Sequence, residues 1–261
     1  LHTCCGLDKD RLDAIRKQYP GVATTERYED VLADPSIDAV VLASPAPAHY
    51  EMASMALSAA KHVYVEKPIT LRSSDAEALV AQAESANKVL MVGHLFEYHP
   101  AVNKLKALAG AGDLGRIHYL YLQRLNLGII RKDENALWSL APHDISIGLY
   151  LLNEDPVSVS ATGQAYLQNG IEDVVFCVLQ FPSGAMVHIH VSWLDPNKTR
   201  RVTVVGSEKM AVFDDMQPAE KVWIYDKGVE GGEFSSYGEW LTIRSGDITI
   251  PRIDASEPLK V

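Results

Sequence analysis

Short apolar runs alternate with amphipathic segments along the first part of the chain, up to about Tyr98. Three segments repeat apolar residues every three or four positions, which predicts helices over residues 8–18, 48–59 and 74–87. The short apolar runs predict strands at residues 2–6, 39–44, 62–65 and 89–93. This alternation is typical of βαβ units with right-handed crossovers, and so predicts an α/β fold with a doubly wound parallel sheet.

After Pro100 the pattern changes to one helix, which reaches Ala111, followed by long segments of alternating polarity. The predicted strands are residues 116–127, 157–163, 173–181, 185–194, 200–206 and 222–225. Hairpin signals at residues 181–184 and 205–210 join neighbouring strands, which predicts a large, mostly antiparallel sheet. We therefore expect two domains, residues 1–98 and 99–261, the second being an α/β domain whose sheet is interrupted by a helix over 142–152.

The chain has no G-x-G-x-x-G turn, although such a turn normally follows the first strand of a dinucleotide-binding sheet. Leu1 already falls at what reads as the second strand, and the pattern is interrupted at Val261. We therefore expect a sequence truncated at both ends that lacks the first βα unit. Such a chain should bind a dinucleotide weakly, because the glycine-rich turn holds the pyrophosphate.

Charge and composition exclude several classes of partner. The formal net charge of −10, with no clustered Lys and Arg, argues against nucleic acid. No apolar run is long enough to cross a membrane and no signal-peptide pattern precedes the fold, so we expect a cytoplasmic protein. Cys4, Cys5 and Cys177 do not form a disulfide pattern and are expected to be buried thiols.

Residues 37–68 read IDAVVLASPAPAHYEMASMALSAAKHVYVEKP. An apolar strand ending in Ser44-Pro45, a histidine that opens a helix, and Glu66-Lys67-Pro68 after the next strand resemble the Gfo/Idh/MocA oxidoreductases at that family's spacing. The resemblance continues over nearly the whole chain, through segments 93–102, 112–120, 124–128 and 137–147. It implies a Rossmann-type first domain that binds NAD, or NADP, and an enzyme that transfers hydride between this cofactor and a secondary alcohol of a sugar or nucleotide sugar.

Lys67 is the first catalytic candidate. It lies at the carboxyl end of a parallel strand, where open α/β sheets bind ligands, and its ammonium could stabilise the alkoxide that forms as hydride leaves. The resemblance implies that Glu66 and Lys67 border the nicotinamide, and Pro68 could fix the turn through a cis bond. A solvated lysine beside a solvated glutamate is the alternative.

His143 is the second catalytic candidate, because an imidazole can accept a hydroxyl proton near neutral pH. The resemblance implies this role, although the family pattern D-x-G-x-H is changed here to Ser139 and Ala141. Asp144 could replace the lost carboxylate in contacting substrate. The alternative is a histidine at a helix start, satisfied by the backbone and Asp144.

Arg124, Asn126 and Trp138 could line a sugar pocket, since Arg124 and Asn126 share one face of a strand and an indole can cover a sugar ring. An exposed strand face is equally compatible with the pattern. Lys198, Arg200 and Arg201 could meet an anionic group such as a diphosphate, or form a solvated turn.

The remaining cofactor candidates are Gly6 and Asp8, after the first strand, and Ser44, Pro45 and His49, after the second. Gly6 stands where the family often has an acidic residue for the ribose, which leaves NADP open, while Asp8 could either serve NAD or cap the first helix. Ser74 and Glu77 form a capping-box pattern in another helix.

No metal site is expected. His94, Glu97 and His99 give H-x-x-E-x-H without a further partner at a recognised spacing. His188 and His190 share a strand face, which could belong to a subunit interface of a homodimer or homotetramer formed through the antiparallel sheet. The rival functions are inositol or free-sugar dehydrogenation, ketosugar reduction, and a catalytically inactive dinucleotide- or sugar-binding protein.

Overall fold

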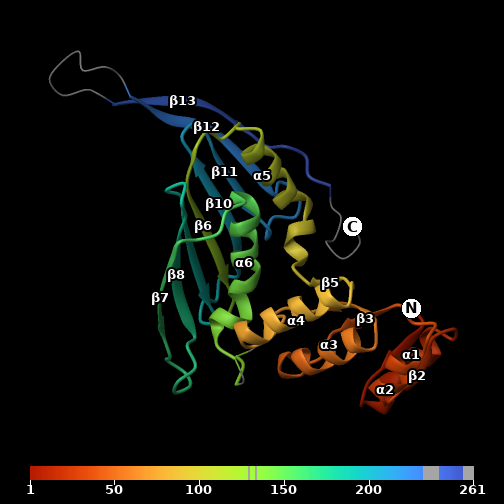
Figure 1. The fold of residues 1–261 in the computed structure, drawn as a ribbon. Helices are drawn as coiled ribbons and strands as arrows, with labels where there is room; N and C mark the ends of the chain where they lie inside the picture. Colours follow the sequence, from red (N-terminus) through yellow and green to blue (C-terminus); the bar gives the residue numbers. More distant parts are fainter. Residues whose placement is uncertain (129, 133, 232–240, 255–261) are drawn as a thin grey trace. The chain divides into compact units, whose positions relative to one another are not determined.

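The computed structural model describes residues 1–128, 130–132, 134–231 and 241–254. It divides into two compact units, residues 1–93 and 94–261 (Figure 1). The division falls five residues before the boundary expected from the sequence pattern. Val261, one basis for the expected truncation, lies outside the described residues.

Unit 1 alternates strands and helices as its sequence pattern predicts. Its elements are β1 (Thr3–Cys5), α1 (Lys9–Gln18), β2 (Ala23–Thr25), α2 (Tyr28–Ala33), β3 (Ala39–Leu42), η1 (Ala46–Ala48), α3 (His49–Ser58), β4 (His62–Val65), α4 (Ser73–Ser85) and β5 (Leu90–Val92). The sequence pattern did not predict β2 and α2. Both are shorter than the windows over which periodicity can be recognised.

All strand pairs of unit 1 are parallel, which confirms the predicted strand direction, but they form two sheets. One has the order β1-β2 and the other β3-β4-β5. In a doubly wound sheet of order 3-2-1-4-5-6 the first strand lies between two such groups. Among the described residues, β1 and β3 are each an edge strand of their own sheet.

Unit 2 contains three helical segments and eight strands among the residues that the structure describes. The helical segments are η2 (Leu95–Tyr98), α5 (Pro100–Gly110) and α6 (Ala136–Leu152). The strands are β6 (Ile117–Leu125), β7 (Ser158–Gln164), β8 (Val174–Gln180), β9 (Met186–Ser192), β10 (Thr199–Gly206), β11 (Met210–Asp214), β12 (Val222–Gly231) and β13 (Leu241–Thr249). They form one sheet of order β13-β12-β11-β10-β6-β9-β8-β7.

This sheet confirms the large, mostly antiparallel sheet predicted for the second domain. Only the β6–β9 pair is parallel among its described strand pairs. The predicted hairpin signals at residues 181–184 and 205–210 join β8 to β9 and β10 to β11. The strands β11 and β13 were not predicted.

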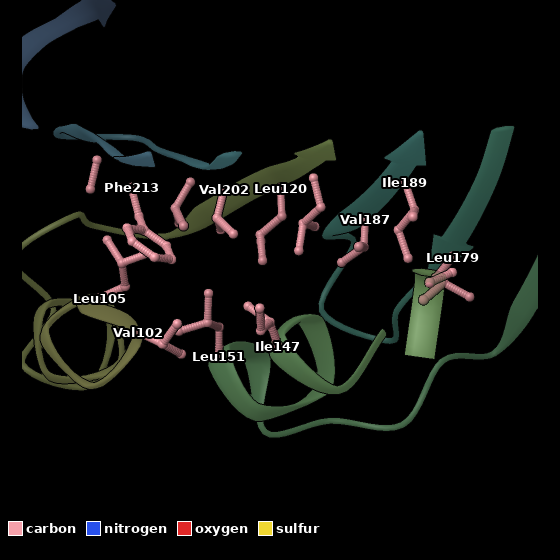
Figure 2. Close-up of a cluster of buried hydrophobic side chains, with 14 of the residues drawn as sticks. Val102, Leu105, Leu120, Ile147, Leu151, Leu179, Val187, Ile189, Val202 and Phe213 are labelled. Carbon is pink, nitrogen blue, oxygen red and sulfur yellow. The ribbon is translucent and has the colours of Figure 1, made fainter. Parts of the chain in front are cut away.

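The core of unit 2 lies between the sheet and helices α5 and α6, which cover one face (Figure 1). Figure 2 shows Leu105 of α5 and Ile147 of α6 pointing toward Leu120 of β6 and Val187 of β9, and all four are fully buried. Burial of a leucine or isoleucine of this kind stabilises a fold by about 1.5–3 kcal/mol. The opposite face keeps large side chains exposed, including Phe176.

Two helix starts differ from the prediction. Helix α6 begins at Ala136, six residues before the predicted start, because Asn135 caps it by accepting a hydrogen bond from Trp138 N, so that Pro142 lies inside the helix. The Ser74–Glu77 capping box is wrong. Helix α4 begins at Ser73 after Arg72, with no side-chain cap.

Candidate functional site

In unit 1 the candidate residues gather at the carboxyl ends of β3 and β4. Ser44 follows β3, and its Oγ is buried without a hydrogen-bond partner among the described residues. Glu66 follows β4 and its backbone N–H donates to Leu42 O at 2.9 Å, which ties the two strand ends together. This arrangement leaves a buried hydroxyl able to bond a group outside the protein chain.

Gly93, directly after β5, allows Glu66 its position. A Cβ at residue 93 would lie 3.1 Å from Glu66 Oε2 and 2.7 Å from the Tyr64 hydroxyl, so a side chain there would displace both. Val63 and Val65 are buried on one face of β4. Tyr64 and Glu66, which alternate with them, therefore project from the opposite face. The Glu66 carboxylate therefore lies at the carboxyl ends of β4 and β5.

The peptide bond between Lys67 and Pro68 is cis, as the sequence analysis expected. His49 lies directly beneath this turn and is 1% exposed. Its Nδ1 is 2.7 Å from Pro68 O, and its Nε2 is 2.8 Å from Ser44 O. The ring thus joins the segment after β3 to the turn after β4. With both ring nitrogens occupied by the backbone, His49 is placed to support Lys67 and Ser44 rather than to bind a ligand itself.

Asp8 caps α1, which confirms one of its two alternatives. Its Oδ1 accepts a hydrogen bond from Arg11 N at 3.1 Å, and its Oδ2 lies 3.2 Å from Arg11 Nε. Gly6 precedes it at the end of β1, where its backbone N–H donates to Thr25 O. Both residues lie just beyond the carboxyl end of β1.

In unit 2 His143 lies within α6 and not at its start. Its ring meets the Phe96 ring edge-on, with centroids 5.2 Å apart and planes inclined by 61°. Ser139, in the family's aspartate position, lies one helical turn earlier and therefore on the same side of α6 as His143. A hydroxyl here cannot supply a carboxylate to substrate.

The substrate candidates Arg124 and Asp144 bond each other. Arg124 Nε donates to Asp144 Oδ2 at 2.8 Å and Arg124 Nη2 to Asp144 Oδ1 at 3.1 Å. The two residues are 6% and 1% exposed. Arg124 is therefore neither on an exposed strand face nor in a pocket lining, the two alternatives of the sequence analysis. Arg124 lies on the same face of β6 as Leu120 and Leu122, which is the face that the helices cover.

Asn126 and Trp138, the other substrate candidates, lie at the surface end of this region. Asn126 N donates to Ser192 O at 3.0 Å, just beyond β6, and a Cβ on Gly128 would approach Asn126 Nδ2 to 2.4 Å. Trp138 is in the first turn of α6 and 45% exposed. Arg124, Asn126 and Trp138 thus do not form one pocket wall, since only the last two have accessible side chains.

Two family models match the chain. One, described as an oxidoreductase family with an NAD-binding Rossmann fold, covers residues 5–94, and the other, described as the GFO/IDH/MocA C-terminal domain, covers residues 102–212. The chain belongs to the Gfo/Idh/MocA oxidoreductase family. The two matches follow the two compact units, so the Gfo/Idh/MocA assignment accounts for both folds.

Curated relatives of known activity occur in this family. The UDP-N-acetylglucosamine 3-dehydrogenase of Acidithiobacillus ferrooxidans is 29% identical over 193 residues, covering 74% of this chain and 59% of the relative. The myo-inositol 2-dehydrogenase of Thermotoga maritima is 25% identical over 238 residues, covering 86% of this chain and 71% of the relative. This chain spans 60% and 59% of the lengths of two curated relatives that it matches.

A solved structure of the UDP-N-acetylglucosamine 3-dehydrogenase GnnA from Acidithiobacillus ferrooxidans also matches. The TM-score is 0.77 at 26% identity, and the match covers 87% of this chain and 72% of that one. The fold class predicted from the sequence is thereby supported over most of the chain.

Two of the three remaining cationic candidates of this Gfo/Idh/MocA chain, Arg200 and Arg201, are paired with carboxylates. Arg201 Nη2 lies 2.6 Å from Asp214 Oδ2, and Arg200 Nη1 lies 3.5 Å from Asp215 Oδ2. Lys198, in the turn before β10, is exposed. The two arginines are therefore bound by carboxylates of this chain, Asp214 at the end of β11 and Asp215 in the turn after it.

The H-x-x-E-x-H segment has a structural role in its last histidine. His99 Nδ1 accepts a hydrogen bond from Ala101 N at 3.1 Å and so caps α5, while its Nε2 lies 3.7 Å from Asp215 Oδ1. Burial lowers the pKa of His99, with Asp215 opposing and Lys221 adding to the shift. Among the described residues no three His, Cys, Asp or Glu side chains are grouped to hold a metal ion.

His188 and His190 lie on the sheet face that the helices leave uncovered. His188 packs against Tyr121, with ring centroids 5.0 Å apart, and His190 stacks on Phe176 at 4.2 Å. Burial lowers the pKa of His190, more than Asp195 raises it, and His188 lowers it further.

Within the described part of the chain, no helix is long and apolar enough to cross a membrane.

Sequence reasoning missed two residues of the site. Phe96 was quoted only as part of a family-like segment, although it lies between Arg124 and His143. Gly93 was taken as a strand end, although it is needed for the close approach of Glu66. A glycine directly after a buried parallel strand is the signal that could have identified the second.

Proposed function

We propose that this protein is an NAD-dependent oxidoreductase that acts on a secondary alcohol of a sugar or nucleotide sugar. The observation that carries the proposal is the group at the carboxyl ends of β3 and β4, where Glu66-Lys67 lies beside a buried, unpartnered Ser44 hydroxyl. Ligands of open α/β sheets bind at such strand ends. The family model for this unit is that of an NAD-binding Rossmann fold.

The chain's own residues fit a dinucleotide at this edge. Ser44 Oγ is an orphaned buried hydroxyl that a ligand could satisfy, and Pro45, beside it, limits the path of the backbone. Gly6 and Asp8 follow β1, at a separate carboxyl end, where a ribose would be held in the proposed arrangement. When bound, the nicotinamide accepts or supplies the hydride. NAD is the proposed cofactor, and NADP remains an alternative.

Lys67 of unit 1 and His143 of unit 2 are the proposed catalytic residues. The Lys67 ammonium would donate a hydrogen bond to the substrate oxygen and stabilise negative charge there, while the His143 imidazole would take the hydroxyl proton. Asn126 and Trp138 are the proposed substrate contacts on unit 2, since both have accessible side chains. Arg124 and Asp144 are not proposed as substrate contacts.

The substrate proposal follows from the relatives. A nucleotide sugar oxidised at its sugar ring is favoured, because the UDP-N-acetylglucosamine 3-dehydrogenase matches both by sequence and by structure. Inositol is the second candidate, favoured by the match to a myo-inositol 2-dehydrogenase.

The test is a substrate panel followed at the nicotinamide absorbance band, with NAD and NADP, on the wild type, two single variants and their double variant. We expect NAD reduction with a nucleotide sugar, and a loss in kcat of about 10²–10⁴-fold in Lys67→Met and in His143→Asn. The double variant should lose little more than either single one, because residues that act as a unit are not additive. No nicotinamide reduction or oxidation with any sugar, nucleotide sugar or inositol would contradict the proposal.

A second copy of this chain is the proposed partner of the uncovered sheet face. Tyr119, Phe176 and Met186 are more than 40% exposed there, on three strands that neighbour one another. Large apolar side chains exposed together on one surface favour association. Sedimentation velocity should give a dimer or tetramer, and Phe176→Asp should give monomers. A monomeric wild type would contradict the proposal.

A further inference from the structure

The pair formed by Arg124 and Asp144 lies below the surface next to the proposed base. Both hydrogen bonds are within 3.1 Å, and the side chains are 7% and 2% exposed. A bidentate pair this deeply buried cannot exchange its partner for a substrate hydroxyl without stranding a charge. The pair therefore acts on the protein around it.

That surrounding protein is Phe96 and His143. The Arg124 guanidinium carbon lies 4.6 Å from the centre of the Phe96 ring, on its face. The Phe96 ring also meets the His143 ring edge-on and stacks with the His99 ring, whose centroid is 6.1 Å away. Asp144 follows His143 in α6. The four residues are thus connected in a ring of contacts. The Arg124 guanidinium contacts the Phe96 ring, and the Phe96 ring contacts the His143 imidazole. Asp144, the next residue in the chain, accepts the hydrogen bonds of the same guanidinium.

We propose that the Arg124–Asp144 pair positions His143 through Phe96 and cancels the charge that Asp144 would otherwise exert on the His143 ring. Arg124, Asp144 and Phe96 are positioning residues in this scheme. The inference rests on the proposed function, because it assigns them to the base of that reaction.

Charge balance is the part of the scheme that a purely structural pair would not require. A lone carboxylate one residue from an imidazole favours the imidazolium, and an imidazolium cannot accept a proton. With Arg124 bonded to both carboxylate oxygens, the pair is neutral overall. Removing either partner should therefore shift the His143 titration, in opposite directions.

Other titratable groups on the elements packed against α6 do not differ between the variants, so they cancel. They are Glu97 and Tyr98 of η2, Lys104 and Lys106 of α5, His118, Tyr119 and Tyr121 of β6, Cys177 of β8, and His188 and His190 of β9, with His94 and His99 flanking η2. Tyr121, His188 and His190 alternate with buried residues and point to the far face of the sheet.

The experiment is a pH titration by NMR of the ring protons of the nine histidines. The signal of His143 is identified by its absence in His143→Asn. In Asp144→Asn the unpaired Arg124 cation should lower the His143 pKa by about one unit. In Arg124→Met the unpaired Asp144 carboxylate should raise it by a similar amount. The double variant Arg124→Met with Asp144→Leu should titrate as the wild type does.

Positioning is tested separately by Arg124→Lys, which keeps the charge but loses the bidentate bond and the flat contact with Phe96. Its His143 titration should match the wild type, while kcat should fall about 10-fold or more with little change in KM. The matched control is Arg201→Met, which also strands a buried carboxylate, that of Asp214, but on the far face of the sheet. It should lower the melting temperature and leave the His143 titration unchanged.

Shifts of the same sign in Asp144→Asn and Arg124→Met, or no shift in either, would overturn the inference. Should Arg124→Met fail to fold, Asp144→Asn and the double variant still decide it, by a lowered value and an unchanged one. The titration needs no substrate, so an inactive wild type would sink the proposed function while the shifts still test this inference.

Discussion

The two units hold their candidate residues by different means. In unit 1 these residues follow the ends of parallel strands, and backbone carbonyls hold them, as His49 is held by Ser44 O and Pro68 O. In unit 2 they lie inside a helix and a long strand, and a charged side-chain pair holds them. A mutation in unit 2 therefore strands a charge, whereas one in unit 1 strands a neutral carbonyl. The first should cost more free energy.

The largest effect should come from Arg124→Met, which leaves the Asp144 carboxylate unpaired and nearly enclosed. The free energy of unfolding of unit 2 should fall by about 3–5 kcal/mol. All four tryptophans lie in unit 2, so urea unfolding followed by their fluorescence reports on this unit. Adding Asp144→Leu should restore most of the lost stability. If the free energy of unfolding of Arg124→Met lies within about 1 kcal/mol of the wild type, the expected difference between the two units is contradicted.

His49→Ala should have the next largest effect, on unit 1. It removes a ring whose two nitrogens lie within 2.8 Å of two backbone carbonyls, to one of which a neutral imidazole donates, and leaves a cavity, which should cost about 2–3 kcal/mol. Hydrogen exchange by mass spectrometry should show faster exchange in peptides of α3 and β4. His62→Ala, which removes one bond, from Val89 N, is the control and should cost about 1 kcal/mol. Equal effects in the two variants would mean that His49 is not a special support of the turn.

A smaller effect separates two helix starts in unit 1. Asp8→Ala should lower stability by about 1 kcal/mol, because Asp8 caps α1. Ser74→Ala should change it by less than about 0.5 kcal/mol, since the Ser74 hydroxyl bonds only the neighbouring Asp75 side chain. The midpoint of chemical unfolding, followed by circular dichroism, compares them. A larger loss in Ser74→Ala would restore the capping box that the structure contradicts.

The smallest effect is a pH dependence in unit 2. Because burial lowers the pKa of His99, the folded ring binds a proton less readily than the unfolded one. Its contribution to stability is complete above the ordinary value of 6.5 and is lost as the pH falls from there through the lowered pKa. In His99→Asn, which keeps a cap acceptor for Ala101 N, the urea midpoint should fall less on acidification than in the wild type. Parallel curves would contradict this assignment.

The sequence predicted those parts of the fold that depend on local pattern. The parallel strands of unit 1, the long antiparallel strands of unit 2 and the cis turn at Lys67-Pro68 all follow from residues close together in the chain. The early start of α6 was missed because Pro142 is a strong local signal for a helix beginning, yet Asn135 already provides the cap. Strands β2 and β11 were missed because they are short and are held by their partners.

The contacts of the candidate site depended on tertiary packing and could not be predicted in the same way. Arg124 and Asp144 were each recognised as chemically important, but nothing in their spacing indicates that the two would bond each other. His49 was predicted to contact the cofactor, whereas its ring nitrogens lie within hydrogen-bond distance of the backbone carbonyls of Ser44 and Pro68. The local pattern around His49 does not indicate either contact. Polar residues in a family-like segment do not reveal which of them face inward.

The parallel pairing of β6 with β9 has a consequence for how this chain is made. Strand β6 has β9 and β10 as its neighbours, and both come much later in the sequence. During synthesis α5, β6 and α6, with Leu105 and Ile147 among their apolar side chains, therefore leave the ribosome before β9 and β10, the two strands that pair with β6. Pairings between segments so far apart form slowly. We therefore expect unit 2 to expose apolar surface while it is being made, and a chaperone that covers this surface should reduce its aggregation.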